Sequence, residues 1–328
     1  MGNRGPQPLR DDDPHEIAGY VLEARIGEGG MGTVFLTRTH DGRHPVALKL
    51  IRREHAQSEN FRRRFAREVE AARRVRGSHL AEVVDHDAEG PRPWLATRYV
   101  PGLPLDVALK EFGPLPVDCV LRLTACAARA LDAVHTAGLI HRDVKPGNLL
   151  LTAEGPWLID FGIARAADGT SALTTVGRMV GTPKYMSPEH ALGRALTPAS
   201  DVFTLGLVAA EAASGRHPYG EGGGFVLATR IAGTAHEPPD LSAHPAALRG
   251  VLAAALAAGP EDRPSAAEIA GLCDRAAGSD MGGSGFAGRL PKQIASAVTA
   301  IERTARKAAP APKDPRASGW LRRMRGDS

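Results

Sequence analysis

Two short segments near the middle of the chain carry residue types that suit phosphoryl transfer. The first reads HRDVKPGN from His141 to Asn148, so that Asp143 and Asn148 lie five residues apart with Lys145 between them. The second, DFG, begins at Asp160, twelve residues beyond Asn148. Carboxylate and amide oxygens bind Mg²⁺, a carboxylate accepts the proton of an attacking hydroxyl, and a lysine stabilises the transferred charge. These residues are therefore the first candidates for a catalytic site.

A glycine-rich segment, GEGGMG from Gly27 to Gly32, is a candidate phosphate-binding loop. The same pattern opens dinucleotide-binding folds, where the loop leads from a strand into a helix. Here an apolar, β-branched run from Thr33 to Leu36 follows, so a hairpin between two strands is predicted. Its backbone N–H groups would cover phosphates without Cβ atoms in the way. An ordinary glycine-rich turn is the alternative interpretation. The candidate residues of this loop are Gly27, Glu28, Gly29, Gly30, Met31, Gly32 and Val34.

Lys49 and Glu68 are the next candidates, from the strand and the helix that follow the loop. Lys49 lies in the strand-like run VALKLI, where its ammonium group would reach phosphate oxygens as a point charge. Glu68 lies among the apolar positions of a helix predicted over 58–76, and a carboxylate near a core-facing stripe needs a cation. Lys49 is the expected partner. A solvated Glu68 is the alternative, with Glu70 competing for the role.

In order and spacing, these motifs resemble the protein kinase superfamily, and within it the bacterial serine/threonine kinases of eukaryotic type. The resemblance spans residues 17–275 and also rests on Gly181-Thr182, Ser187-Pro188-Glu189, Asp201 and Arg263. It implies an α+β, two-lobed protein kinase fold, with a small β-rich N-lobe containing one main helix and a larger, mainly helical C-lobe.

The resemblance also implies catalytic roles for the matching residues. Asp143 would orient the substrate hydroxyl, Lys145 would stabilise the transferring phosphoryl group, and Thr182 would bridge these two side chains. Asn148 and Asp160 would bind Mg²⁺, with Mn²⁺ as an alternative ion.

For ATP, the resemblance assigns Lys49 to the α- and β-phosphates, paired with Glu68. Backbone groups of Arg98 and Val100 in the hinge would meet the adenine, and Thr97 would guard the pocket behind it. Apolar side chains would sandwich the adenine ring: Val34, Ala47 and Leu150. Glu189 with Arg263 would form a buried ion pair, and Asp201 would fix the backbone around His141.

The domain organisation follows from changes of pattern along the chain. Strand-like alternation dominates up to about residue 100 and helical spacing dominates beyond it. We expect a flexible leader over 1–16, a kinase domain over 17–275 divided near residue 100 into N-lobe and C-lobe, and a basic, largely disordered tail over 276–328. An amphipathic stretch in the tail, around Ile294 and Val298, is interpreted as a solvated linker with one marginal helix. Docking on a partner or an anionic membrane surface is the alternative.

Charge and cysteine content exclude several classes of protein. The net charge is +4, but residues 276–328 hold ten Lys or Arg and four Asp or Glu, which leaves the rest slightly acidic. Such a body is not typical of a nucleic-acid-binding domain. The three cysteines support neither a disulfide framework nor a zinc site, and no apolar run is long enough to span a membrane. We therefore expect a cytoplasmic location, no nucleic-acid partner and no transmembrane segment.

The leading functional prediction is an ATP-dependent serine/threonine protein kinase that acts on Ser/Thr hydroxyls of protein substrates. Autophosphorylation of the loop after the DFG motif is expected at Thr170, Ser171, Thr174 or Thr175, with Arg142 binding the phosphate and a homodimer allowing reaction in trans. A catalytically silent pseudokinase scaffold is the alternative, and a kinase of small molecules comes third.

Overall fold

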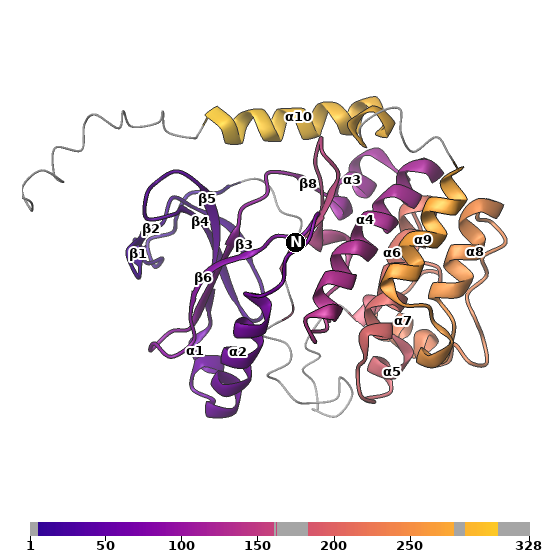
Figure 1. Ribbon diagram of the computed structural model, residues 1–328, viewed down its shortest axis with the longest axis horizontal. Helices are drawn as coiled ribbons and strands as arrows, with labels where there is room; N and C mark the ends of the chain where they lie inside the picture. The colour runs from indigo at the N-terminus through magenta and orange to yellow at the C-terminus, as the bar shows by residue number, and fades with distance from the viewer. Residues whose placement is uncertain (1–5, 161, 163–182, 279–285, 308–328) are drawn as a thin grey trace, which may run out of the picture.

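The computed structural model describes residues 6–160, 162, 183–278 and 286–307, and every structural statement below concerns these residues. A sheet-rich part and a helical part lie side by side, with α2 beside the sheet (Figure 1). The predicted two-lobed α+β kinase fold is confirmed. Phe161, Thr182 and the expected phosphorylation sites lie outside the described residues.

The N-lobe is built on a five-stranded antiparallel sheet in the order β3-β4-β5-β7-β6. Its strands are β3 (Ala24–Glu28), β4 (Gly32–Arg38), β5 (Pro45–Ile51), β6 (Val83–Asp87) and β7 (Trp94–Arg98). A short hairpin of β1 (Glu16–Ile17) and β2 (Tyr20–Val21) precedes the sheet, and α1 (Arg53–Ala56) follows β5. Successive strand residues face opposite sides. Val46 and Leu48 are therefore buried on one face, while Ala47 and Lys49 lie half-buried on the other.

Helix α2 (Glu59–Ala72) is the one main helix of the N-lobe. Ser58 caps its start by accepting a hydrogen bond from the Phe61 amide, as an N-cap serine does. Phe61, Phe65, Val69 and Ala72 form its buried face, as their spacing predicts. This face packs in the same apolar cluster as Ile51 and Leu95 of the sheet, so the helix is held against β5 and β7.

The C-lobe is mainly helical and carries one small sheet. Its helices are α3 (Leu105–Phe112), α4 (Val117–Thr136), α5 (Pro188–Ala191), α6 (Pro198–Ser214), α7 (Gly224–Ala232), α8 (Ala246–Ala255) and α9 (Ala266–Ala277). A three-stranded sheet in the order β10-β9-β8 faces the N-lobe and consists of β8 (Leu103–Pro104), β9 (Leu149–Leu151) and β10 (Pro156–Leu158). Helix α6 is buried along most of its length and begins at a capping box of Thr197 and Ser200.

A buried ion pair joins α5 to the loop before α9, as predicted. The Arg263 guanidinium donates to both oxygens of Glu189, at 2.9 and 3.0 Å, and the Ser200 hydroxyl donates to the same carboxylate. The Arg263 side chain is fully buried. Because an unpaired buried charge is strongly destabilising, either residue depends on the other for its place in the core.

The prediction of a flexible leader is wrong for residues 6–16. Gln7 exchanges backbone hydrogen bonds with Arg25 at 2.8 Å in both directions, which adds it to the free edge of β3. Leu9 packs against the apolar cluster of the sheet, and Asp13 forms an ion pair with Arg25. A segment that is polar in sequence is thus held by specific pairing that composition does not reveal.

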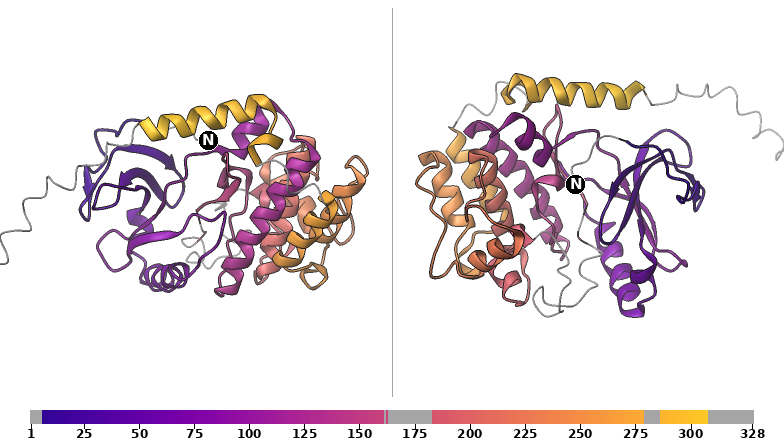
Figure 2. Two further views of the ribbon diagram at one scale, coloured as in Figure 1. Left: turned by 45° about the horizontal axis from the view of Figure 1, so that its top comes forward. Right: turned by 180° about the vertical axis from the view of Figure 1, so that it is seen from behind.

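The prediction of a largely disordered tail is wrong for residues 286–307. Helix α10 (Lys292–Lys307) runs along β8 and α3, at the top of Figure 1 and again in both views of Figure 2. Ile294 and Val298 are buried in the same core as α4, and the Glu302 carboxylate accepts a hydrogen bond from the Ala153 amide at 2.8 Å. The amphipathic stretch therefore docks on its own chain, so the interpretation as a solvated linker is also wrong.

None of the helices within the described ranges combines the length and apolar composition that a membrane span requires.

The packing of α10 predicts that Val298→Ala destabilises the full chain by about 1.5–3 kcal/mol, because two buried methyl groups are lost and a cavity remains. Val226→Ala, at a position that is 44% exposed, is the matched control and should change the free energy of unfolding by less than about 0.5 kcal/mol. Urea unfolding of both variants measures the difference. If both variants lose the same small free energy of unfolding, the docking of α10 is contradicted.

Candidate active site

The loop from His141 to Asn148 gathers the predicted catalytic residues around Asp143. The Lys145 ammonium group donates to Asp143 Oδ2 at 2.8 Å. The Asn148 side-chain amide donates to the same oxygen at 3.0 Å and to the Asp143 carbonyl at 2.8 Å. A carboxylate bound by an ammonium group and an amide stays oriented, as the predicted role of Asp143 requires.

Asp201, at the start of α6, fixes the backbone that carries this loop. Its carboxylate accepts hydrogen bonds from the backbone amide of His141 at 2.7 Å and from that of Arg142 at 2.8 Å. It also contacts His135 Nε2 at 2.8 Å. Arg142 has a left-handed backbone with φ of +62°, which is costly for a residue with a Cβ. The hydrogen bonds to Asp201 hold this conformation, in agreement with the predicted role.

Lys49 and Asp160 form an ion pair that connects β5 to the segment after β10. The Lys49 ammonium group donates to both carboxylate oxygens of Asp160, at 2.7 and 2.8 Å. Burial would raise the pKa of the Asp160 carboxyl, but Lys49 and, further away, Lys145 outweigh it and hold that pKa below its usual value. Asp160 is therefore a carboxylate at neutral pH.

The DFG segment is placed by the loop beside it. Asp160 has a left-handed φ of +58°, and the Gly162 amide donates to the His141 carbonyl at 2.9 Å. A Cβ on Gly162 would lie 2.4 Å from that carbonyl oxygen, so only glycine fits at this position.

The predicted pairing of Lys49 with Glu68 is wrong for this structure. Glu68 instead accepts a hydrogen bond from Arg142 Nη1 at 2.7 Å, and its side chain is 17% exposed. Burial raises the pKa of Glu68, and Arg142 partly offsets this effect. The carboxylate does need a cation, as the sequence predicts. Arg142 supplies it, while Lys49 is bound to Asp160.

The glycine-rich loop connects β3 to β4 as a hairpin, as predicted. The Gly29 amide donates to the Gly32 carbonyl at 2.9 Å and closes the turn. A Cβ on Gly32 would lie 2.1 Å from the Leu50 carbonyl oxygen, so glycine is required where β4 begins to pair with β5. Arg52 Nε donates to the Gly29 carbonyl at 3.1 Å, a contact that the sequence did not indicate.

The residues predicted to surround adenine lie on neighbouring elements. Ala47 on β5 pairs with Thr97 on β7, and Val34 on β4 pairs with Lys49. Val100 and Leu150 lie in a small apolar cluster with Ala81. The Arg98 amide donates to the Glu82 carbonyl, so Arg98 would offer its carbonyl group to a ligand.

The donor set beside Asp143 fits a hard divalent cation. The Asn148 amide nitrogen is used in hydrogen bonds to Asp143, which leaves its carbonyl oxygen as an acceptor, and Asp160 supplies carboxylate oxygens. Two such ligands completed by phosphate and water oxygens are typical of Mg²⁺. Elsewhere among the described residues, no cluster of three His, Cys, Asp or Glu suits a metal ion.

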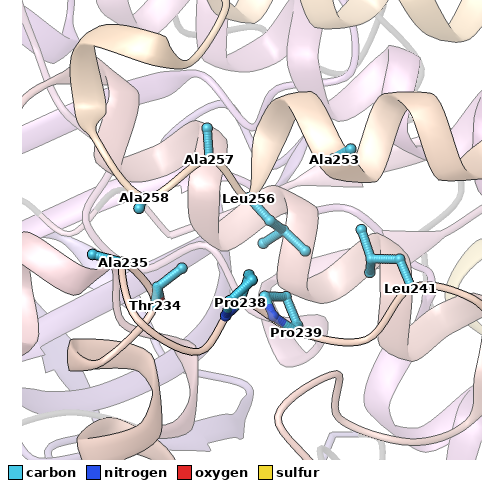
Figure 3. A pocket seen from close by; sticks show the side chains of 9 residues that line it. All are labelled: Thr234, Ala235, Pro238, Pro239, Leu241, Ala253, Leu256, Ala257 and Ala258. Carbon is cyan, nitrogen blue, oxygen red and sulfur yellow. The ribbon is translucent and has the colours of Figure 1, made fainter.

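A second concave region lies in the C-lobe, between α8 and the segment before it (Figure 3). Its described lining is apolar apart from Thr234, and that hydroxyl is bonded to Tyr219 and to the Ile231 carbonyl. The lining residues are Thr234, Ala235, Pro238, Pro239, Leu241, Ala253, Leu256, Ala257 and Ala258. The pocket therefore offers no acid, base or metal ligand.

Comparison with known proteins agrees with this geometry. The family model described as "Protein kinase domain" matches residues 20–271. The chain is 46% identical over 263 residues to the probable serine/threonine-protein kinase PkwA of Thermomonospora curvata, which covers 80% of this chain and 35% of that protein. It is 43% identical over 293 residues to the serine/threonine-protein kinase AfsK of Streptomyces coelicolor, covering 88% and 36% of the two. The chain thus spans about a third of the length of these curated relatives.

Among solved structures, the kinase domain of Mycobacterium tuberculosis PknI is similar to this chain. The TM-score is 0.62 at 32% sequence identity, and the match covers 80% of this chain and 97% of that one. The order of strands and helices, the Asp143 cluster and the family match over residues 20–271 lead to one conclusion. This chain belongs to the protein kinase domain family.

Proposed function

We propose that this chain is an ATP-dependent serine/threonine protein kinase, which transfers the γ-phosphoryl group of ATP to Ser or Thr hydroxyls of proteins. The observation that carries the proposal is the bonded set of Asp143, Lys145 and Asn148 beside the Lys49–Asp160 pair. Relatives named serine/threonine-protein kinases support it.

Each side chain then has a chemical task in phosphoryl transfer, which depends mainly on positioning and charge stabilisation. Asp143 orients the substrate hydroxyl and accepts its proton as the new P–O bond forms and the bond to the ADP oxygen breaks. Lys145 balances charge on the transferring group. Lys49 binds the α- and β-phosphates. Thr182 is proposed to bridge Asp143 and Lys145.

Asn148 and Asp160 are the residues that would hold Mg²⁺, with Mn²⁺ as a second possibility. A bound divalent ion supplies neutralising charge to the phosphate oxygens. Because Lys49 occupies both oxygens of Asp160 in this structure, Lys49 has to turn partly toward the nucleotide when ATP binds.

The pairing of Glu68 with Arg142 supports an inactive conformation, in which Glu68 is not paired with Lys49. Kinase activity requires the lysine of the third strand to pair with the helix glutamate, and activation-loop phosphorylation controls that pairing. A phosphate at Thr174 or Thr175 carries about −1.5 to −2 charges, so it competes with Glu68 for the Arg142 guanidinium. Once released, Glu68 is available to Lys49. Thr170 and Ser171 are the other candidate acceptors.

The partners follow from this chemistry. Protein substrates present the acceptor hydroxyl, and a homodimer allows one copy to phosphorylate another; no nucleic-acid partner is proposed. A cytoplasmic location is part of the same proposal, since ATP is its substrate and the three cysteines are buried free thiols, as a reducing compartment favours.

Activity measurements with labelled ATP and Mg²⁺ test the proposal directly. We expect wild type to label itself or a generic basic protein, and we expect Asp143→Asn to lower the rate by about 10²–10⁴-fold, because the hydroxyl loses its base. Lys49→Met and Asp160→Asn should reduce labelling to background, whereas Asp41→Asn, in an exposed turn, should leave it unchanged. Absence of labelling by wild type would favour the pseudokinase.

Phosphorylation of the activation loop is tested by mapping modified residues after incubation with ATP, with Lys49→Met as the inactive control. We expect phosphate at Thr174 or Thr175. The double variant Thr174→Ala, Thr175→Ala should lower the initial rate by about tenfold, equivalent to the loss of one charge-assisted hydrogen bond. Thr304→Ala, an exposed position on α10, is the matched control. If residues 170–175 carry no phosphate after incubation with ATP, regulation by phosphorylation of the activation loop is refuted.

A further inference from the structure

The glycine-rich loop is connected to the N-terminal segment by a chain of charged side chains. Asp13 and Arg25 form a two-pronged ion pair, with Arg25 Nε 2.6 Å from Asp13 Oδ2 and Nη2 2.7 Å from Oδ1. The pair is buried, since the two side chains are only 3% and 10% exposed. Arg25 lies on β3, which leads into the loop, and its remaining nitrogen Nη1 donates to Glu28 at 3.0 Å. Glu28 is the last residue of β3, directly before Gly29 of the loop.

Asp13 is held in place by its own backbone surroundings. The Arg10 amide donates to Asp13 Oδ2 at 2.8 Å, and the Asp13 amide donates to the Arg10 carbonyl at 3.0 Å. Gln7 adds two backbone hydrogen bonds to Arg25. The hydrogen bond from Arg25 lowers the pKa of the Asp13 carboxyl, so the ion pair persists at neutral pH.

The buried pair determines how Arg25 meets the loop. A bidentate carboxylate fixes the plane of a guanidinium group, so Arg25 approaches Glu28 with little freedom. Glu28 is 41% exposed, and an exposed ion pair on its own contributes little. Two further guanidinium groups surround the same carboxylate, Arg10 at 3.4 Å and Arg52 at 3.3 Å. The Arg10 and Arg52 side chains are 58% and 43% exposed, whereas Arg25 is 10% exposed and fixed by Asp13, so Arg25 contributes the most rigid of the three contacts to Glu28.

We propose that Asp13 is a positioning residue for the nucleotide-binding loop. It fixes Arg25, Arg25 holds Glu28, and the loop is kept in the conformation that covers the ATP phosphates. A preorganised loop loses less conformational freedom when its ligand binds, so Asp13 acts on ATP binding and not on phosphoryl transfer. Asp13 lies outside residues 20–271 that match the kinase family model, and the inference rests on the proposed kinase function.

The experiment compares KM for ATP and kcat in Asp13→Asn, Glu28→Gln and the double variant of the full chain. Each single variant should raise KM by about five- to tenfold and leave kcat within about twofold, because ground-state and transition-state binding are lost together. The double variant should raise KM no more than Glu28→Gln alone, since Asp13 acts on the loop through Arg25 and Glu28. Glu23→Gln is the matched control: it breaks the Arg38–Glu23 pair of 2.8 Å on the same sheet, which does not contact the loop.

Several outcomes would overturn the proposal. If Asp13→Asn lowers the melting temperature while KM stays unchanged, the pair only stabilises the lobe. If the KM increases of the two single variants multiply in the double variant, Asp13 acts on ATP binding by a route other than Glu28. Should Asp13→Asn fail to fold, Glu28→Gln leaves the buried pair intact and decides alone: an unchanged KM contradicts the proposal.

Equilibrium titration with a fluorescent ATP analogue separates this inference from the proposed function. We expect the dissociation constant to rise in Asp13→Asn and Glu28→Gln by the same factor as KM. A wild type that binds the analogue but transfers no phosphate would disprove the kinase activity, and the titration would still test the role of Asp13.

Discussion

The ion pair between Lys49 and Asp160 is the interaction on which the candidate site depends. It joins the third strand of the N-lobe sheet to the segment after β10 in the C-lobe, residues 111 positions apart in the chain. Strand alternation places Lys49 on the face opposite Val46 and Leu48, and the left-handed backbone of Asp160 turns its carboxylate toward that face. Together with the Glu68–Arg142 pair, it is a charged contact between the N-lobe and the C-lobe.

The other charges of the site are distributed around this pair. Lys49 is bound to Asp160, Glu68 has Arg142 as its cation, and Arg142 in turn lies on a backbone held by Asp201. The half-buried carboxylate of Glu68 thus connects α2 to the catalytic loop. On the proposed function, this set of pairs is one of two arrangements, and the choice between them depends on which anion Arg142 binds.

Some of the site could be predicted from the sequence because its contacts are local. Asp143, Lys145 and Asn148 lie within one short loop, so their spacing already implies that they meet. Helix α2 was predictable from the spacing of its apolar residues, and the strand after the glycine-rich loop from its β-branched residues. Spacing thus indicated phosphoryl transfer, while the kinase fold was predicted from the resemblance that the ordered motifs carry.

The remaining features depend on contacts between distant parts of the chain, which the spacing of residues in the sequence does not predict. Glu68 binds Arg142 and Lys49 binds Asp160, and both pairs join residues that lie far apart in the sequence. Asp13 is one of several acidic residues in a polar stretch, and its burial depends on a partner across the edge of the sheet. The spacing of α10 predicts an amphipathic helix but not the surface that it covers.

The most direct test of this account is the structure of the chain bound to Mg²⁺ and a non-hydrolysable ATP analogue, before and after activation-loop phosphorylation. We predict that Lys49 lies within hydrogen-bond distance of Glu68 in the phosphorylated complex, with Arg142 bound to the phosphate. An active, phosphorylated enzyme in which Glu68 still binds Arg142 would contradict it.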